Sequence, residues 1–305
     1  MSFNGCHPYS TWAKHGQINL TEFAIIAVLN GFAILPTIAL NALVLVSIWR
    51  TPELHTPSMV LMGNLALSDF GVGAITQPAL IIWAYVELYI EDSPRTLCYS
   101  SQAFGSIATV FAGVSLLSVS AVGFDRFLAL HLHLRYSTIV TAKRTFAVCL
   151  SFWAFSLLVV LLWFTLGVSI YNFTVNGCII ALFGITIVRY LYIYKVIKRH
   201  QTQIHAEQSN LFSTDIKQYK KSVINSIVVY FVFAICSTPF VCALTYYEIT
   251  KDNILSPKAF RLTVSLLLAN SLVNPVIFCW KIKELRLAVW QIVMKLKISL
   301  IGNDK

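Results

Sequence analysis

The sequence predicts an all-α membrane protein, a seven-transmembrane helix bundle followed by a short amphipathic eighth helix. Of its 305 residues, 57% are hydrophobic and only 12% are charged, which is too apolar for a soluble domain of this length. Uncharged stretches of the roughly 20 residues that a helix needs to cross a hydrocarbon core of about 30 Å recur along the chain. Both observations indicate membrane-spanning helices.

Five segments each predict one span: 23–49, 54–86, 96–124, 222–247 and 262–280. Only Asp69 interrupts the second of them with a charge. The stretch 145–188 carries no charge across 44 residues, which is too long for one crossing and long enough for two. We expect a turn between Ser169 and Gly177 to divide it, because this segment is rich in Asn and Gly, which tolerate the backbone angles of turns. The total is seven spans.

The basic residues predict the orientation. Seven spans place the termini on opposite faces, and the loops on the C-terminal side hold 16 Lys and Arg against five on the other side. Because cytoplasmic loops carry the excess of positive charge, we expect one plasma-membrane domain, 1–305, with an extracellular N-terminus (1–21), seven spans (22–280) and a cytoplasmic helix and tail (281–305). No signal peptide is recognised, so the first span is expected to act as the signal anchor. This topology and anionic lipid explain the net charge of +10, so no nucleic-acid partner is expected.

Two acceptor patterns for N-glycosylation fall on the side predicted to be extracellular. They begin at Asn19 and Asn172, each followed by Thr two positions later. The pattern is common by chance, so each site alone is a weak signal.

Polar residues inside the spans are few, and in lipid they must bond within the bundle or line water. Besides Asp69 they are Asn41, Ser115, Asn270, Ser271 and Asn274. A buried carboxylate needs a cation, a proton or several donors, so Asp69 with Ser115, Asn270, Ser271 and Asn274 could form a hydrated sodium site. The alternative is a protonated Asp69 that is merely hydrogen-bonded to its neighbours.

With these motifs in view, residues 22–297 resemble a rhodopsin-like (class A) G-protein-coupled receptor. The residues that carry the resemblance are Asn41, the run Leu65-Ala66-Leu67-Ser68-Asp69, Asp125-Arg126-Phe127, Trp153, Pro239 and Asn274-Pro275-Val276-Ile277-Phe278. In this family Asp125-Arg126-Phe127 corresponds to the DRY motif and Asn274 to Phe278 to NPxxY. Ser115 lies eleven residues before Arg126, where the family places its sodium-site serine.

The resemblance implies a mechanism in which an extracellular ligand biases a two-state bundle and a heterotrimeric G protein binds the opened inner face. Arg126 would pair with Asp125 at rest and meet the G protein when the receptor is active. Leu134 matches the apolar residue that inserts into the G protein, and Tyr190 matches a fifth-helix tyrosine that supports the open state.

Three departures from the family pattern affect the switch. Ser237 replaces the tryptophan two residues before Pro239, Phe278 replaces the tyrosine of NPxxY, and Tyr219 stands where many relatives keep an acid facing the DRY arginine. A constitutively active or ligand-independent receptor, or a modulatory partner, is therefore the alternative to a ligand-gated one.

The outer half narrows the ligand class. Leu182 replaces the usual fifth-helix proline and only about ten residues remain for the second outer loop, as in the melanocortin, cannabinoid, lysophospholipid and adenosine branch. Ala108 replaces the acid of amine receptors and Leu268 replaces the retinal lysine of opsins, so neither an amine nor retinal is expected. A small apolar or lipid-like ligand is favoured, near candidate wall residues Gln77, Trp83, Phe104, Tyr246 and Tyr247.

The resemblance also suggests a disulfide between Cys98 and Cys178, because the family joins its third helix to its second outer loop. Both cysteines are expected on the oxidising side, with Cys6 as a competing partner.

After the last span, apolar residues recur at helical spacing among basic ones, which predicts an amphipathic helix on inner-leaflet lipid. They are Ile282, Leu285, Val289, Ile292, Val293 and Leu296. The odd span count and the absence of related halves disfavour a transporter. No converging nucleophiles or metal ligands indicate an enzyme, and no cofactor other than the possible sodium ion is expected.

Overall fold

The computed structural model describes residues 18–90, 93–132, 135–206, 210–251 and 255–302, and within these ranges it contains helices and no strand. The long helices are α2 (Leu20–Arg50), α3 (Pro57–Gly71), α4 (Gln77–Tyr89), α5 (Pro94–Leu132), α7 (Ala142–Leu166), α8 (Val168–Ala206), α9 (Asn210–Thr250), α10 (Leu255–Lys281) and α11 (Lys283–Gly302). In the described residues, seven segments are long and apolar enough to cross a membrane, with α3 and α4 counted as one span. The predicted seven spans and the all-α fold are confirmed.

Side-chain caps begin several of these helices. The Asn19 side chain accepts a hydrogen bond from the backbone N–H of Glu22 at 2.8 Å, and Thr56 does the same for Met59 at 3.4 Å. Pro57, at the start of α3, has no N–H to leave unpaired. Such caps satisfy amide groups that the helix itself cannot bond, so the sequence sets where the spans start.

The second span is interrupted by a π-helix, Val72–Thr76, between α3 and α4. It lies just before Pro78, which has no N–H to donate to the preceding turn. A wider turn accommodates this missing bond and changes the faces that α3 and α4 present. The π-helix therefore sets how the residues beyond Asp69 point into the bundle.

The turn between the fourth and fifth spans is not where the sequence analysis placed it. Helix α7 ends at Leu166 and α8 begins at Val168, so Gly167 alone forms the link, with φ at +90°. Only glycine adopts this φ readily, and a one-residue link needs it. The predicted turn segment, 169–177, is helical instead, and the expected ten-residue outer loop is wrong.

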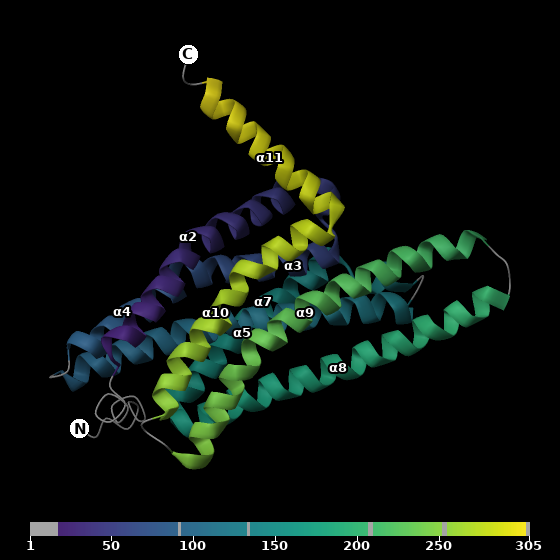
Figure 1. Cartoon of the computed structure of the whole chain (residues 1–305). Helices are drawn as coiled ribbons and strands as arrows, with labels where there is room; N and C mark the ends of the chain where they lie inside the picture. The colour runs from purple at the N-terminus through teal and green to yellow at the C-terminus, as the bar shows by residue number, and fades with distance from the viewer. Residues whose placement is uncertain (1–17, 91–92, 133–134, 207–209, 252–254, 303–305) are drawn as a thin grey trace.

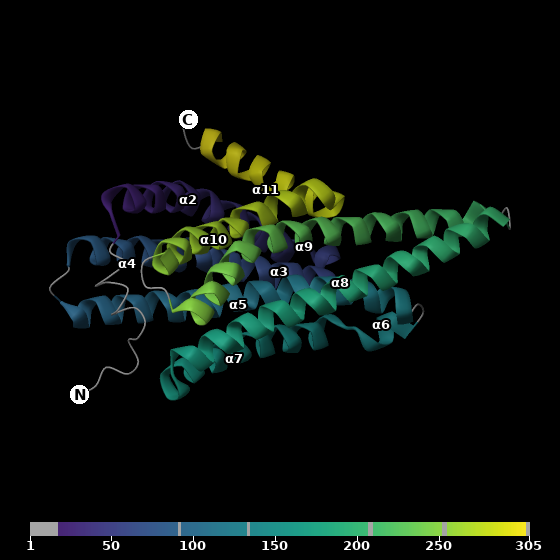
Figure 2. The ribbon, with the colours of Figure 1, turned by 60° about the horizontal axis from the view of Figure 1, so that its bottom comes forward.

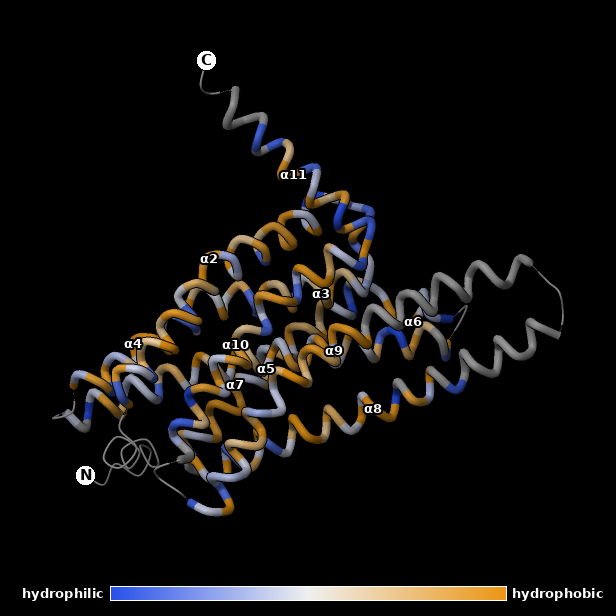
Figure 3. Tube along the Cα trace, in the orientation of Figure 1, coloured by the Kyte–Doolittle hydropathy of each residue, from blue (hydrophilic) through white to orange (hydrophobic). Residues whose placement is uncertain are grey.

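The helices form a bundle (Figures 1 and 2), in which α5 packs against α3, α7, α8 and α9. We call the end where α2 begins the outer end and the opposite end the inner end, following the predicted topology. Helices α8 and α9 continue beyond the other spans as a long pair (Figure 1). Apolar segments dominate the bundle (Figure 3). A short helix, α6 (Tyr136–Ile139), follows α5.

The last helix, α11, turns away from α10 and packs along the inner end of α2. Leu285, Ala288 and Ile292 are buried, whereas Lys283, Glu284 and Arg286 are exposed. This arrangement confirms the predicted amphipathic helix, which is 20 residues long.

Helices α3, α5 and α7 meet in a tightly packed junction. The indole of Trp153 donates to the Asn64 amide oxygen at 3.0 Å, and the Asn64 amide nitrogen donates to Ser118 at 2.8 Å. The ring of Phe111 packs edge-on against Trp153 and lies against Gly71, where an added Cβ would stand 2.1 Å from a ring carbon. The ring is held on both sides, so a side chain at Gly71 would have to displace it.

We predict that Gly71→Ala lowers the apparent melting temperature of the purified receptor, because overpacking a filled junction typically costs about 1–3 kcal/mol. The matched control is Gly31→Ala in α2, where an added Cβ meets nothing within 4 Å. This control should melt at or above the parent, since alanine favours helix over glycine. Thermal unfolding in detergent micelles measures both variants, and a Gly71→Ala receptor as stable as the control would contradict the packing.

Candidate functional site

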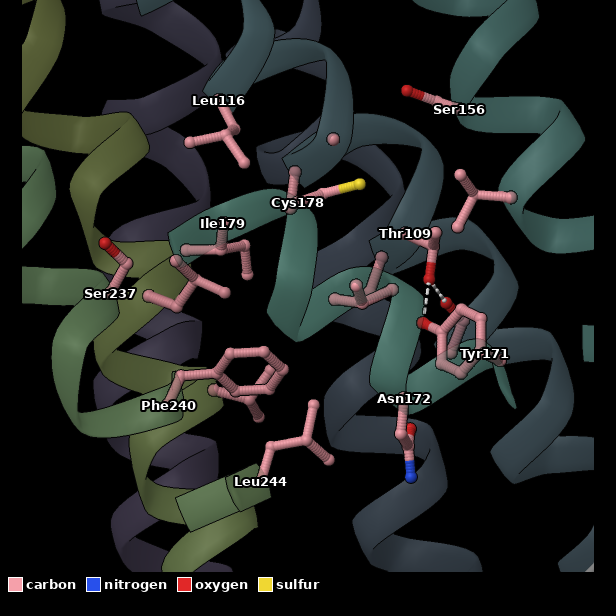
Figure 4. Close-up of a pocket in the computed structure, with 18 of the residues that line it drawn as sticks. Thr109, Leu116, Ser156, Tyr171, Asn172, Cys178, Ile179, Ser237, Phe240 and Leu244 are labelled. Atoms are coloured by element: carbon pink, nitrogen blue, oxygen red, sulfur yellow. Dashed lines mark hydrogen bonds between the residues drawn. The ribbon is translucent and has the colours of Figure 1, made fainter. Parts of the chain in front are cut away.

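A cavity of about 120 Å³ opens among α5, α7, α8, α9 and α10 in the outer half of the bundle (Figure 4). None of the described residues that line it is charged. Its wall is mostly apolar and includes Leu116, Ile179, Phe240 and Leu244. Such a surface gains affinity mainly by burying apolar groups of a ligand.

Most of the polar groups at the wall already have a hydrogen-bond partner. Thr109 and the Tyr171 hydroxyl share a hydrogen bond, and the Asn172 amide donates to Glu248 at 2.6 Å. The Ser237 hydroxyl donates a hydrogen bond to the backbone oxygen of Phe233 at 2.5 Å. Ser237 is 1% exposed and lines the cavity, so the small side chain that replaces the family's tryptophan leaves space there.

Aromatic side chains pack at the outer end of this cavity. Phe104 stacks on Trp83 with ring centroids 5.2 Å apart, and Phe240 lies 5.5 Å from Phe260. Of the wall candidates named from the sequence, Phe104 lines the cavity, whereas Trp83 stacks on the ring of Phe104 and is not itself a lining residue. Gln77, Tyr246 and Tyr247 are not among its lining residues.

The carboxylate of Asp69 is the centre of a buried polar cluster below the outer cavity. It accepts hydrogen bonds from Ser115 at 3.2 Å, Ser271 at 2.8 Å and Asn274 at 2.7 Å. These donors come from α5 and α10, so the cluster joins three spans. The structure thus brings together Asp69 and three of the four side chains predicted to surround it.

Asn270 belongs to the same predicted set and lies one turn before Asn274 on α10. The amide oxygens of Asn270 and Asn274 are both buried and have no hydrogen-bond partner in the described part of the chain. Oxygen acceptors beside a carboxylate are the groups that a hard cation prefers. The residues present therefore fit a sodium ion.

The inner end carries the second predicted site. A side-chain nitrogen of Arg126 lies 2.6 Å from a carboxylate oxygen of Asp125, which confirms the predicted contact within the pair. Asp125 is 3% exposed and also accepts from Ser58 and Tyr136, each at 2.5 Å. The pair is thus held by α3 and α6 as well, which the sequence analysis missed.

Tyr136 is suited to donate to this carboxylate. Burial, and then the hydrogen bond to Asp125, raise the pKa of Tyr136, so the phenol keeps its proton at neutral pH. The signal available in the sequence was weak, because a tyrosine in an inner loop has many possible neighbours.

A cavity of about 480 Å³ lies beside this network at the inner end. Arg126 and Tyr136 line it together with Phe278 and residues from the start of α3. Phe127 faces another way and packs against Tyr192 of α8 with ring centroids 5.5 Å apart. Of the Asp125-Arg126-Phe127 motif, Arg126 is therefore the residue that lines the inner cavity.

The remaining switch residues are placed as follows. Pro239 and Pro275 lie inside α9 and α10, and Phe278 is 2% exposed. Leu134 lies outside the described residues. The side chains of Tyr190 and Tyr219 are likewise not among those the structure describes, so their predicted roles stay predictions.

The predicted disulfide between Cys98 and Cys178 is wrong. Cys98 is disulfide-bonded, but the thiol of Cys178 is free. The physical reason is that Gly167 alone links α7 to α8, so Cys178 lies within α8 at the wall of the cavity instead of in a loop. The competing partner, Cys6, lies outside the described residues.

The two glycosylation candidates differ. Asn19 is exposed at the start of α2 and stays a candidate. Asn172 is 4% exposed inside α8, so its amide nitrogen, the atom that would carry a glycan, is buried in the bundle. Asn172 is therefore not a glycosylation site in this structure.

Comparison with known proteins agrees with this architecture. The family described as 7 transmembrane receptor (rhodopsin family) matches residues 40–182 and 168–278. G-protein coupled receptor 3 of Rattus norvegicus is 28% identical over 268 residues, which cover 83% of this chain and 77% of that protein. G-protein coupled receptor 12 of Homo sapiens is 27% identical, covering 82% of this chain and 75% of that protein.

Melanocortin receptor 5 of Ovis aries is 24% identical over 263 residues, covering 83% of this chain and 79% of that protein. These relatives are receptors and not enzymes. Because the family match spans well over half of the chain, including Asp69, Arg126 and Asn274, this protein belongs to the rhodopsin-like family of G-protein-coupled receptors.

Proposed function

We propose that this receptor lies in the plasma membrane, responds to a small apolar or lipid-like extracellular ligand and activates a heterotrimeric G protein through Arg126. The observation that carries the ligand class is the outer cavity, whose lining contains no charged residue in the part of the chain that the structure describes. A charged ligand would lose its hydration there without gaining a partner, whereas an apolar ligand gains free energy from burial.

The proposed orientation places the N-terminus outside and α11 against lipid of the inner leaflet. The excess of basic residues in the loops predicted to be cytoplasmic supports it. Helix α11 carries Lys283, Arg286 and Lys295 beside its apolar face, a combination that favours anionic lipid as a further partner.

The inner site supports the G-protein step. Asp125 holds Arg126 in the resting arrangement, and Ser58 and Tyr136 hold Asp125. A ligand that prefers the open bundle shifts the population toward an Arg126 that is free to contact the G protein. The inner cavity that Arg126 lines is the place for that contact.

Signalling without a diffusible ligand is the second candidate. The inner cavity of about 480 Å³ favours it, because Arg126 already lines a cavity at the inner end, where the G protein would bind. The small Ser237 in place of tryptophan also removes a bulky group that would otherwise need a ligand to reposition it.

The experiment that tests the ligand class is a screen of apolar and lipid-like compounds with reporters for each G-protein class, each read with and without compound. We predict that Ala108→Phe reduces the potency of any active compound by about tenfold or more, because the ring fills space in the cavity. Ala103→Phe, on the exposed face of the same helix, is the control and should keep the parent's potency. Strong basal output with no active compound would favour the second candidate, and an unaffected Ala108→Phe response would place the ligand elsewhere.

We predict that Asp125→Asn raises basal signalling at matched surface level. The amide loses the charge that holds Arg126, and hydrogen bonds between charged groups contribute about 1.5–3 kcal/mol. Tyr136→Phe removes one donor but keeps the ion pair, so its basal output should lie between those of the parent and Asp125→Asn. Second-messenger output without ligand measures all three receptors, and unchanged output from Asp125→Asn would refute this role of the pair.

We further propose that Asp69 binds an allosteric sodium ion with Ser115, Asn270, Ser271 and Asn274. The unpartnered amide oxygens of Asn270 and Asn274 support this site. Bound sodium would favour the resting bundle, because it holds α3, α5 and α10 together around the carboxylate.

We predict that sodium raises the apparent melting temperature of the purified receptor relative to choline at equal ionic strength. A ligand that binds only the folded state adds about 2.7 kcal/mol at 100 times its Kd. Asp69→Asn should remove the sodium dependence, whereas Ser118→Ala, one turn from Ser115 and bonded to Asn64 instead, should keep it. Identical melting of the parent in the two salts would exclude the site.

A further inference from the structure

A row of buried polar side chains follows the faces that α2, α4 and α10 turn toward each other. From the outer end inward it contains Glu22, Asn30, Thr37 and Asn41 on α2, Glu87, Gln77 and Thr76 on the second span, and Arg261, Ser265 and Ser271 on α10. We call this row the polar seam. All of its members except Glu22 are at most 5% exposed, and none of them lines the outer cavity.

Several atoms in the seam have no hydrogen-bond partner among the residues that the structure describes. They are both amide atoms of Gln77, the hydroxyls of Thr37 and Thr76, the amide oxygen of Asn41 and one carboxylate oxygen of Glu87. Gln77, Thr76 and Thr37 are 0% exposed, so bulk solvent does not reach them in this conformation. Buried polar groups of this kind are normally satisfied by ordered water.

Contacts at the inner end join the seam to the Asp69 cluster. Thr37 lies against Gly73, where an added Cβ would stand 3.0 Å from its methyl carbon. Thr76 ends the π-helix that contains Gly73, and Gln77 follows it, so both lie about one turn outward of this contact. One turn inward from Thr37, the Asn41 amide donates to the backbone oxygen of Ser271 at 3.0 Å, and the Ser271 hydroxyl donates to Asp69.

Contacts at the outer end close the seam. Asn30 donates to Ser265 at 3.1 Å, one turn inward from Arg261. The guanidinium of Arg261, 1% exposed, pairs with Glu87 at 2.8 Å and with Glu22 at 3.1 Å, and Lys258 lies 3.5 Å from Glu22. Two acids and two bases leave no net charge at this mouth to repel a small cation.

A cation that moved toward Asp69 through the outer cavity would pass uncharged, mostly apolar walls and lose its hydration without compensation. The seam instead offers oxygen atoms at intervals of about one to two helical turns. We propose that water and a small monovalent cation reach Asp69 along the polar seam between α2, α4 and α10, with the Arg261 ion pairs as its outer closure. This inference rests on the proposed sodium site only for its destination.

Silver ion tests the path, because it is a small monovalent cation that binds thiolate tightly. We would express Gln77→Cys and, as a nearly isosteric second variant, Thr37→Cys in intact cells, and apply Ag⁺ outside in chloride-free medium for graded times. After denaturation, mass spectrometry of the peptide carrying the new cysteine measures how much thiol is still open to alkylation, so the native cysteines do not interfere.

The matched control is Val114→Cys on α5, also 0% exposed, which belongs neither to the seam nor to the lining of the outer cavity. General loosening of the bundle would expose residues 77 and 114 alike. We expect Ag⁺ to protect the thiols at positions 77 and 37 about tenfold faster or more than the thiol at position 114, which reacts only after local opening.

Equal rates at positions 77 and 114, or no protection at both 77 and 37, would overturn the path. The outcome is separable from that of the sodium site. Fast protection in a receptor whose melting ignores sodium would remove the site and keep the path, whereas sodium-dependent melting without protection would keep the site and remove the path.

Discussion

The buried carboxylate of Asp69 is the constraint on which the rest of the bundle depends. In a membrane interior it has to be satisfied by the protein itself, and the donors come from two other spans, Ser115 on α5 and Ser271 and Asn274 on α10. Meeting this requirement fixes the relative heights and rotations of α3, α5 and α10. Any motion of α10 has to rearrange these bonds, so the cluster is a natural place for a two-state element.

Two cavities that differ in the charge of their lining residues lie on either side of that constraint. The outer one, with no charged residue among the described residues of its lining, suits an apolar ligand, and the inner one is lined by Arg126. Between them on α5, Val119 is 2% exposed and lies between Leu116 of the outer lining and Val122 of the inner lining. Because packed interiors change between discrete arrangements, a ligand above and a G protein below can act on the same equilibrium.

Three charged residues at the outer ends of the spans have a role that the sequence analysis missed. Glu22, Glu87 and Arg261 each stand one residue outside a predicted uncharged stretch, where a charge ordinarily meets water. In the structure Arg261 is buried and pairs with both acids. These edge charges therefore belong to the interior of the bundle. Removing one partner of a buried ion pair costs far more folding free energy than removing one partner of an exposed pair. Only the packing of three helices reveals this.

The sequence by itself determined the seven spans, the Asp69 cluster as a group of polar residues, and the pairing of the adjacent Asp125 and Arg126, because apolar length and nearest neighbours are local properties. Tertiary structure decided the turn at Gly167, which left Cys178 inside a helix with a free thiol and Asn172 bonded to Glu248. It also decided that Ser58, 67 residues away, holds Asp125, and that Arg261, 174 residues away, meets Glu87. Such contacts depend on how helices rotate and pack against each other, which many equally apolar surfaces leave open.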